Sequence, residues 1–133
     1  MGRWLAREPA MQSLTRDLAE GAAGLRNALL KGRWNDAATH IARYWQIKKE
    51  LYPGSTTPAI DLLFLETRDD YLAAGLAGAG GGGFAYFLCK HGRQADRLRD
   101  RLSEYSTRPG VTGSVYETRI NHRGLLVKTT AAR

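Results

Sequence analysis

A run of small residues between two apolar segments is the part of this sequence best suited to ligand binding. It consists of Gly78, Ala79, Gly80, Gly81, Gly82 and Gly83. Glycine adopts backbone conformations closed to other residues, so that consecutive peptide N–H groups can point toward one ligand. Four consecutive glycines also cost entropy on folding, which a loop without a role does not repay. The run therefore predicts an anion-binding loop, and a flexible hairpin loop is the alternative that composition leaves open.

This glycine run differs from two familiar phosphate-binding loops. A P-loop ends in Gly-Lys-Ser or Gly-Lys-Thr, whereas Phe84 follows the run here. A dinucleotide-binding fingerprint opens a helix, but the apolar segment 84–89 carries three aromatic residues and predicts a buried strand. The chemistry of the loop therefore has to be inferred from its own backbone.

Other residues that could do chemistry lack a supporting pattern. The histidines His40, His91 and His122 lie far apart and show no zinc-ligand spacing, so we expect surface or turn positions. The pair Asp69-Asp70 is more typical of a helix end or a turn than of a carboxylate dyad, and no serine has a triad context. We assign no catalytic residue and no metal site.

Helices are expected in the first half of the chain. Apolar residues recur at helical spacing over 14–29, with Pro9 near the start and Gly32 after the end. A second helix is expected to begin with Asn35 as its N-terminal cap and to end at Pro53, which cannot continue the hydrogen-bond ladder. These segments predict two neighbouring amphipathic helices.

A third helix and a change of period follow. Thr57 can cap this helix and Pro58 suits its first turn. Short apolar segments at 72–77 and 84–89 flank the glycine run and predict two strands, and helical spacing returns over 94–105. The glycine run would then lie at a hairpin tip.

The end of the chain predicts one more pair of strands. Residues 115–120 alternate, 121–124 resemble a hairpin turn and 125–127 would form the returning strand. Helices followed by this sheet indicate one α+β domain over 1–133, with an antiparallel sheet covered by helices on one face.

Charge and cysteine content limit the partners and the cellular location that we expect. The net charge is +7, and residues 90–133 carry ten Lys and Arg against four Asp and Glu. A basic region favours phosphate, but no nucleic-acid recognition motif accompanies it, so we do not expect nucleic acid as a partner. The glycines interrupt the longest uncharged stretch, which argues against a membrane span, and Cys89 is the one cysteine. No secretory signal is visible, and a reducing cytoplasm fits these features.

Two blocks of the sequence resemble the GHMP kinases, the family of galactokinase and of homoserine, mevalonate and phosphomevalonate kinases. Residues 76–84 are similar to the third conserved motif of that family, and 44–60 resemble a stretch that precedes it in the L-fucose and heptose phosphate kinase branch. Val115-Tyr116-Glu117 and Gly124-Leu125 are similar to the family's last strands. The likeness covers nearly the whole chain.

The resemblance implies the C-terminal domain of an ATP-dependent sugar kinase, with ATP and Mg²⁺ as cofactors of the complete enzyme. The glycine loop would help form the site for a sugar or sugar phosphate beside an N-terminal kinase domain, supplied in cis or in trans. A non-catalytic binding or regulatory module derived from such a kinase is the alternative. A homodimer is a further expectation, because a half-enzyme exposes the surface that its other half covers.

The sequence departs from the family in two respects. The ATP-binding loop of the family lies in its N-terminal domain, and no such motif occurs here. The family usually has a lysine immediately before the motif's leucine, where this chain has Gly75. We therefore expect no kinase activity from these 133 residues alone.

Overall fold

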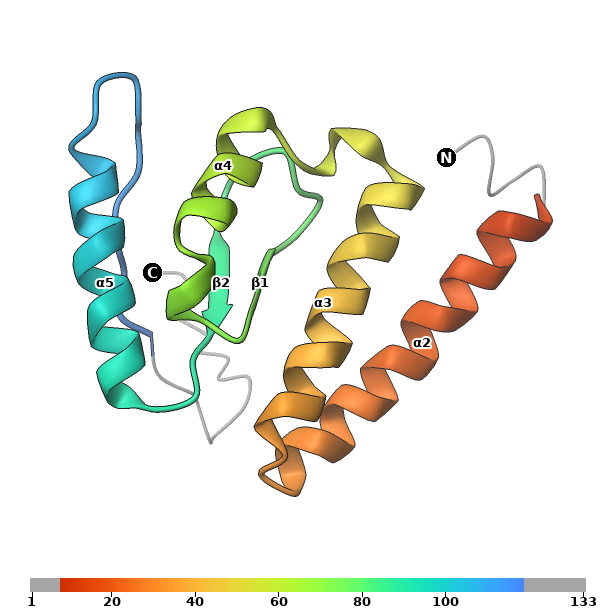
Figure 1. Ribbon diagram of the computed structural model, residues 1–133. Helices are drawn as coiled ribbons and strands as arrows, with labels where there is room; N and C mark the ends of the chain where they lie inside the picture. The colour runs from red at the N-terminus through yellow and green to blue at the C-terminus, as the bar shows by residue number, and fades with distance from the viewer. Residues whose placement is uncertain (1–7, 119–133) are drawn as a thin grey trace, which may run out of the picture.

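A computed structural model describes residues 8–118 of the chain. The elements are α2 (Pro9–Leu30), α3 (Trp34–Leu51), the 3₁₀ turn η1 (Pro53–Ser55), α4 (Pro58–Glu66), the 3₁₀ turn η2 (Arg68–Asp70), β1 (Ala73–Leu76), β2 (Ala85–Leu88) and α5 (Gly92–Ser106). Helices α2 and α3 lie side by side at one end of the molecule, and α5 lies at the other (Figure 1). The predicted α+β fold is confirmed.

Most of the predicted helix boundaries are confirmed. Pro9 occupies the first turn of α2, and Gly32 after this helix has a φ of 65°. The Thr57 hydroxyl accepts a hydrogen bond from the N–H of Ile60 at 3.3 Å, which caps α4. Proline in the first turn lacks an N–H group that would have no partner there. Glycine after the end of a helix can adopt the positive φ that lets the chain turn away.

The predicted Asn35 cap is wrong. Helix α3 already begins at Trp34, and Arg33 occupies the cap position without a side-chain cap bond. The cause is the short connection from α2, in which the N–H of Arg33 donates to the carbonyl of Ala28 at 2.9 Å. The carbonyl of Arg33 then accepts the first helical bond, from Ala37 at 3.0 Å, so that Asn35 lies inside the first turn.

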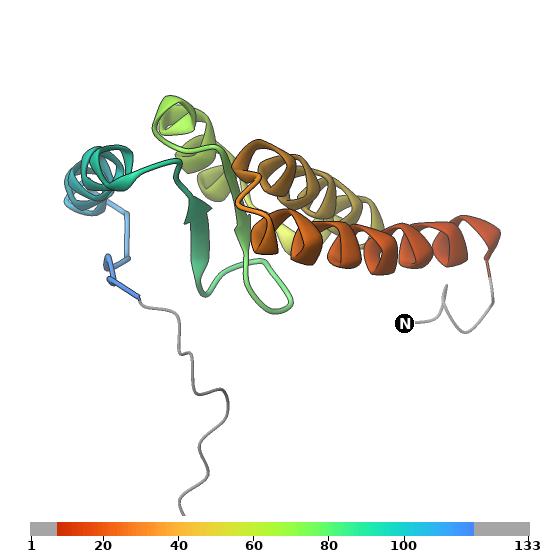
Figure 2. The ribbon, with the colours of Figure 1, turned by 90° about the horizontal axis from the view of Figure 1, so that it is seen from below.

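The two described strands form an antiparallel hairpin. Ala73 pairs with Leu88 and Leu76 with Ala85, and the N–H of Ala77 donates to the carbonyl of Phe84 at 2.8 Å. The glycine run connects the two strands, as predicted, and extends from their ends as a loop (Figure 2). A two-stranded hairpin is marginal by itself, so helix packing has to hold it.

Two apolar clusters supply that packing. Trp45 of α3 and Phe64 of α4 meet edge to face, with ring centroids 5.9 Å apart, over Leu76 of β1. In the second cluster, Ala38 and Ile41 of α3 lie against Ala73 of β1. Alternate residues of β1 thus enter different clusters, as the two-residue period of a strand requires. Helix α3 contributes to both clusters and is the main support of the hairpin.

The expected strand over 115–120 is not formed in its described part. Residues 115–118 have no regular structure, and the ring of Tyr116 instead packs on Phe84, with the centroids 6.0 Å apart. An alternating pattern becomes a strand only where a partner edge supplies hydrogen bonds, and none reaches these four residues among those described. The expected turn at 121–124 and strand at 125–127 lie outside the described residues.

Among residues 8–118, no helix is long and apolar enough to span a bilayer. The side chain of Trp34 is 45% exposed. It lies at the very start of α3, where the connection from α2 leaves its ring uncovered.

Candidate functional site: the glycine loop and its supports

The glycine loop, defined here as residues 78–83, lies at the tip of the hairpin. All of its glycines have positive φ, with values of 69° at Gly78, 94° at Gly80 and 74° at Gly81. L-residues pay for such conformations because their Cβ approaches the backbone. The loop is largely exposed, so a ligand can reach its backbone.

A turn from the preceding motif supports this loop. The N–H of Gly81 donates to the carbonyl of Ser55 in η1 at 2.7 Å. The approach is so close at Gly80 that a Cβ there would lie 2.8 Å from the Cα of Ser55. Glycine at position 80 is thus required both by its φ and by this contact. The two sequence blocks that resemble the GHMP kinases therefore meet in space.

Lys48 of α3 also supports the loop, and it belongs to the same sequence block as Ser55, residues 44–60. Its Nζ donates to the carbonyl of Leu76 at 2.9 Å and to the carbonyl of Gly78 at 2.5 Å. Partial burial lowers the pKa of Lys48 from its ordinary value, because a less hydrated ammonium is harder to keep charged. The sequence singled out Lys48 only as part of a resembling block, and its contact with the loop comes from the fold.

Several donors and one hydroxyl around the loop have no partner within the described chain. No acceptor in residues 8–118 meets the N–H groups of Gly78, Ala79, Gly80, Gly82 and Gly83. The Oγ of Ser55 is fully buried and likewise has no hydrogen-bond partner there. The five amides lie on a largely exposed glycine-rich tip, where an anion could accept from them in place of water.

At position 75, the side chain of Tyr86 occupies the space that a lysine would need. Gly75 pairs with Tyr86 across the hairpin, and a Cβ at position 75 would lie 2.7 Å from the Tyr86 hydroxyl. The phenol of Tyr86 thus fills the space of a side chain at that position. Any longer residue there would have to displace the tyrosine ring.

Comparison with known families decides the relationship. A family model described as "GHMP kinases C terminal" matches residues 25–107, which is well over half of the chain. The chain belongs to the GHMP kinase family. The match includes both supports of the loop, Lys48 and Ser55, as well as the loop itself.

Curated relatives place this GHMP kinase domain near fucokinases. It is 32% identical over 104 residues, 78% of the chain, to a bifunctional fucokinase/GDP-fucose pyrophosphorylase of Arabidopsis thaliana. It is 28% identical over 97 residues, 73% of the chain, to an L-fucokinase/L-fucose-1-P guanylyltransferase of Bacteroides fragilis. The matched part spans 10% of the length of each relative. No solved structure matches the chain.

The remaining candidate residues of this GHMP kinase domain lie away from the loop. The Nδ1 of His91 accepts a hydrogen bond from the N–H of Gln94 at 3.2 Å. His91 is therefore the N-terminal cap of α5. Asp69 and Asp70 lie in η2, in agreement with the turn expected for them. His122 lies outside the described residues. Within 8–118, no group of three His, Cys, Asp or Glu side chains could hold a metal.

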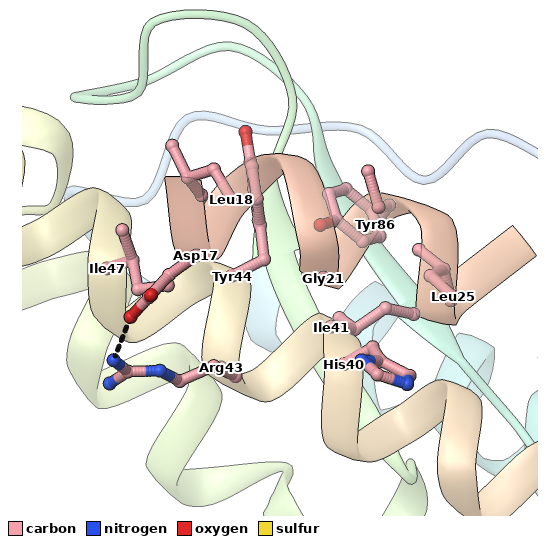
Figure 3. A pocket seen from close by; sticks show the side chains of 11 residues that line it. Asp17, Leu18, Gly21, Leu25, His40, Ile41, Arg43, Tyr44, Ile47 and Tyr86 are labelled. Carbon is pink, nitrogen blue, oxygen red and sulfur yellow. Dashed lines mark hydrogen bonds and ion pairs between the residues drawn. The ribbon is translucent and has the colours of Figure 1, made fainter. Parts of the chain in front are cut away.

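One pocket escaped sequence reasoning because no motif marks it. It has a volume of about 240 Å³ and lies between α2 and α3, with Tyr86 of β2 also lining it (Figure 3). Its walls are mostly apolar, and the Asp17–Arg43 ion pair, 3.0 Å long, lies among its lining residues. The signal available in the sequence was the presence of small residues on α2. At Gly24, for example, a Cβ would overlap the ring of His40, so glycine leaves room for that ring. No residue of the glycine loop lines this pocket.

Proposed function

We propose that this chain is the C-terminal domain of an ATP-dependent, fucokinase-like sugar kinase, and that its glycine loop helps form the site for the substrate and the transferred phosphate. The observation that carries the proposal is the set of loop amides at Gly78, Ala79, Gly80, Gly82 and Gly83 without an acceptor in residues 8–118. Membership of the GHMP kinase family supports it, as do the two fucokinase relatives.

Phosphoryl transfer needs little covalent help from the protein, so positioning and charge stabilisation carry most of the catalysis. Backbone N–H groups held in a fixed direction stabilise developing negative charge without reorganising during the reaction. The glycine loop supplies donors of this type, and the contacts of Ser55 and Lys48 with the loop restrict its motion. Its role in the complete enzyme is to hold phosphate or sugar oxygens at the mouth of the site.

The cofactors proposed for the complete enzyme are ATP and Mg²⁺. The donors of the glycine loop fit the oxygens of a phosphate group. Mg²⁺ prefers carboxylate oxygens together with substrate phosphates, and the described residues contain no cluster of acidic side chains for it. We therefore assign the Mg²⁺ ligands and the ATP-binding loop to an N-terminal kinase domain, the partner proposed in cis or in trans. The proposed location is the cytoplasm.

A chimaera tests the proposal directly. The matching 97-residue segment of the Bacteroides fragilis enzyme is replaced by the corresponding part of this chain, and fucose-dependent ADP release is measured. The chimaera is expected to phosphorylate L-fucose. A second chimaera carrying Gly81→Val should lose about a hundredfold in kcat, the scale of a misplaced positioning group, while a third carrying Arg99→Ala on the exposed side of α5 should not.

A non-catalytic binding module is the alternative function. It predicts that the chain binds sugar phosphates by itself while the chimaera remains inactive. Thermal unfolding of the 133-residue chain with millimolar L-fucose 1-phosphate measures this, because a ligand of the folded state raises the melting temperature. An active chimaera favours the kinase domain, and a stabilised but inactive one favours the module.

A further inference from the structure

We propose that Lys48 is the positioning residue of the glycine loop: by holding the carbonyls of Leu76 and Gly78 on one side, it keeps the amide of Ala79 directed to the other side, toward a bound phosphate. The inference rests on the anion-binding role proposed above. It adds a specific residue on α3 and a direction for the loop's donors.

The first step concerns the peptide between Leu76 and Ala77. Its carbonyl accepts from the Nζ of Lys48 at 2.9 Å, and its N–H donates to the carbonyl of Phe84 at 2.8 Å. The C=O and N–H of a trans peptide point in opposite directions. Lys48 therefore lies on the side of β1 away from β2, where it takes the place that a neighbouring strand would have.

The second step concerns the peptide between Gly78 and Ala79. Its carbonyl also accepts from Lys48, at 2.5 Å. Because this peptide is planar and trans, the N–H of Ala79 points away from the ammonium. No acceptor within residues 8–118 meets that N–H. One cation thus fixes two carbonyls and leaves an amide donor facing outward.

The third step concerns the loss of hydration of the Lys48 ammonium group and the contacts that offset it. Lys48 also lies over the rings of Tyr44 and Trp45, with Nζ 5.8 Å and 5.7 Å from their centroids. Aromatic faces attract a cation and partly replace the water that burial removes. Hydrogen bonds to an ionised donor are also stronger than those between neutral groups. The charge is therefore used to hold carbonyls, and the loop's amides remain available for an anion.

The neighbouring Lys49 provides a matched control. Its Nζ lies 5.9 Å from the centroid of the Trp45 ring, and it makes no hydrogen bond to the glycine loop. Lys48→Met and Lys49→Met remove the same charge from adjacent positions of α3. A difference between the two variants therefore reports the hydrogen bonds to the loop and not the net charge.

The test uses the ¹⁵N,¹³C-labelled 133-residue chain and NMR, first without ligand. In Lys48→Met, the carbonyl ¹³C shifts of Leu76 and Gly78 should move, and the heteronuclear NOE of residues 78–83 should fall. Lys49→Met should leave both unchanged, and Lys48→Arg should restore the NOE in large part. A loop that stays equally ordered in folded Lys48→Met overturns the proposal.

Inorganic phosphate is then titrated into each variant while the loop amides are followed. The apparent Kd for phosphate of Lys48→Met should exceed that of Lys49→Met by about fivefold. This factor corresponds to the loss of about one hydrogen bond to the phosphate. Equal weakening in the two variants assigns the effect to charge and overturns positioning. If phosphate does not shift the loop amides of the unmodified chain, the anion-binding function fails, while the ligand-free comparison still decides the role of Lys48. If Lys48→Met does not fold, Lys48→Gln takes its place with the same criteria.

Discussion

Arg101 and Asp70 join helix α5 to the segment that precedes the hairpin. The Nη1 of Arg101 lies 2.6 Å from the Oδ2 of Asp70, although 31 residues separate them, and its Nη2 donates to the carbonyl of Glu66 at 2.8 Å. The Nε of Arg97 lies 3.7 Å from the other oxygen of Asp70. Two arginines of α5, Arg97 and Arg101, therefore have a structural role.

Asp70→Asn should lower the free energy of unfolding by about 2 kcal/mol, because Asp70 is buried and its replacement weakens charge-assisted bonds to Arg101. Urea unfolding followed by circular dichroism measures the change. Asp69→Asn is the matched control, since Asp69 is 89% exposed and should change stability by less than about 0.5 kcal/mol. Equal effects at the two positions would contradict the role of Asp70.

Cys89 should react slowly with thiol reagents. Burial raises the pKa of its thiol, and the charge of Asp70 raises it further. A raised pKa leaves less thiolate at any pH below it, so modification by a disulfide reagent at pH 8 should be slower than that of a free cysteine peptide. The rate should rise with pH up to the elevated pKa. Asp70→Asn should speed the reaction in folded protein, and an unchanged rate would remove Asp70 as a cause.

Gly80→Ala and Gly78→Ala separate backbone strain from steric contact. Both positions have positive φ, so each alanine should cost about 1–2 kcal/mol in unfolding free energy. A Cβ at Gly78 meets open space, whereas one at Gly80 would lie 2.8 Å from the Cα of Ser55. Gly80→Ala should therefore be the more destabilising of the two, and the shift of the N–H resonance of Gly81 should report its lost bond to Ser55. Equal costs would show that the loop moves away from η1 freely.

Ser55→Ala should leave stability unchanged or raise it by about 1 kcal/mol, since a buried hydroxyl without a partner carries an uncompensated desolvation cost. The Oγ of Ser55 is such a group within the described chain. The carbonyl that accepts from Gly81 is unaffected by this change. Thermal and urea unfolding give the result. A loss of more than about 1 kcal/mol would show that the hydroxyl has a partner in solution.

The chain should self-associate at high concentration. Leu62 and Leu65 of α4 are 47% and 60% exposed, and Phe84 beside the glycine loop is 68% exposed. Leu62 and Leu65 lie three residues apart in α4, so they share one side of the helix and can form an apolar contact with a second copy, most often in a symmetric pair. Light scattering should give a mass near twice 14.7 kDa as concentration rises. A constant mass of 14.7 kDa at high concentration would contradict association.

Local patterns in the sequence predicted much of the described fold. Pro9, Gly32 and the Thr57 cap act through neighbours a few residues away, so their effects can be read from sequence alone. The hairpin and its glycine loop were predicted for the same reason, since two short apolar segments around glycines leave few other arrangements. The Asn35 cap failed because the tight connection after α2, closed by the bond from Arg33 to Ala28, places Arg33 at the cap position and starts α3 earlier.

The supports of the loop are determined by the tertiary structure. Lys48 lies 30 residues from Gly78 in the chain, and Ser55 reaches Gly81 only because α3 runs beside β1 and ends near the hairpin tip. Likewise, the strand expected at 115–120 depended on a partner edge, and within the described residues none pairs with 115–118. Amino-acid sequence alone determined which residues can turn and cap, and it predicted an anion-binding loop, because those properties belong to single residues and their neighbours. Tertiary structure decided which carbonyls and amides meet, because hydrogen bonds act over about 3 Å and distant segments reach that range only when their apolar faces pack.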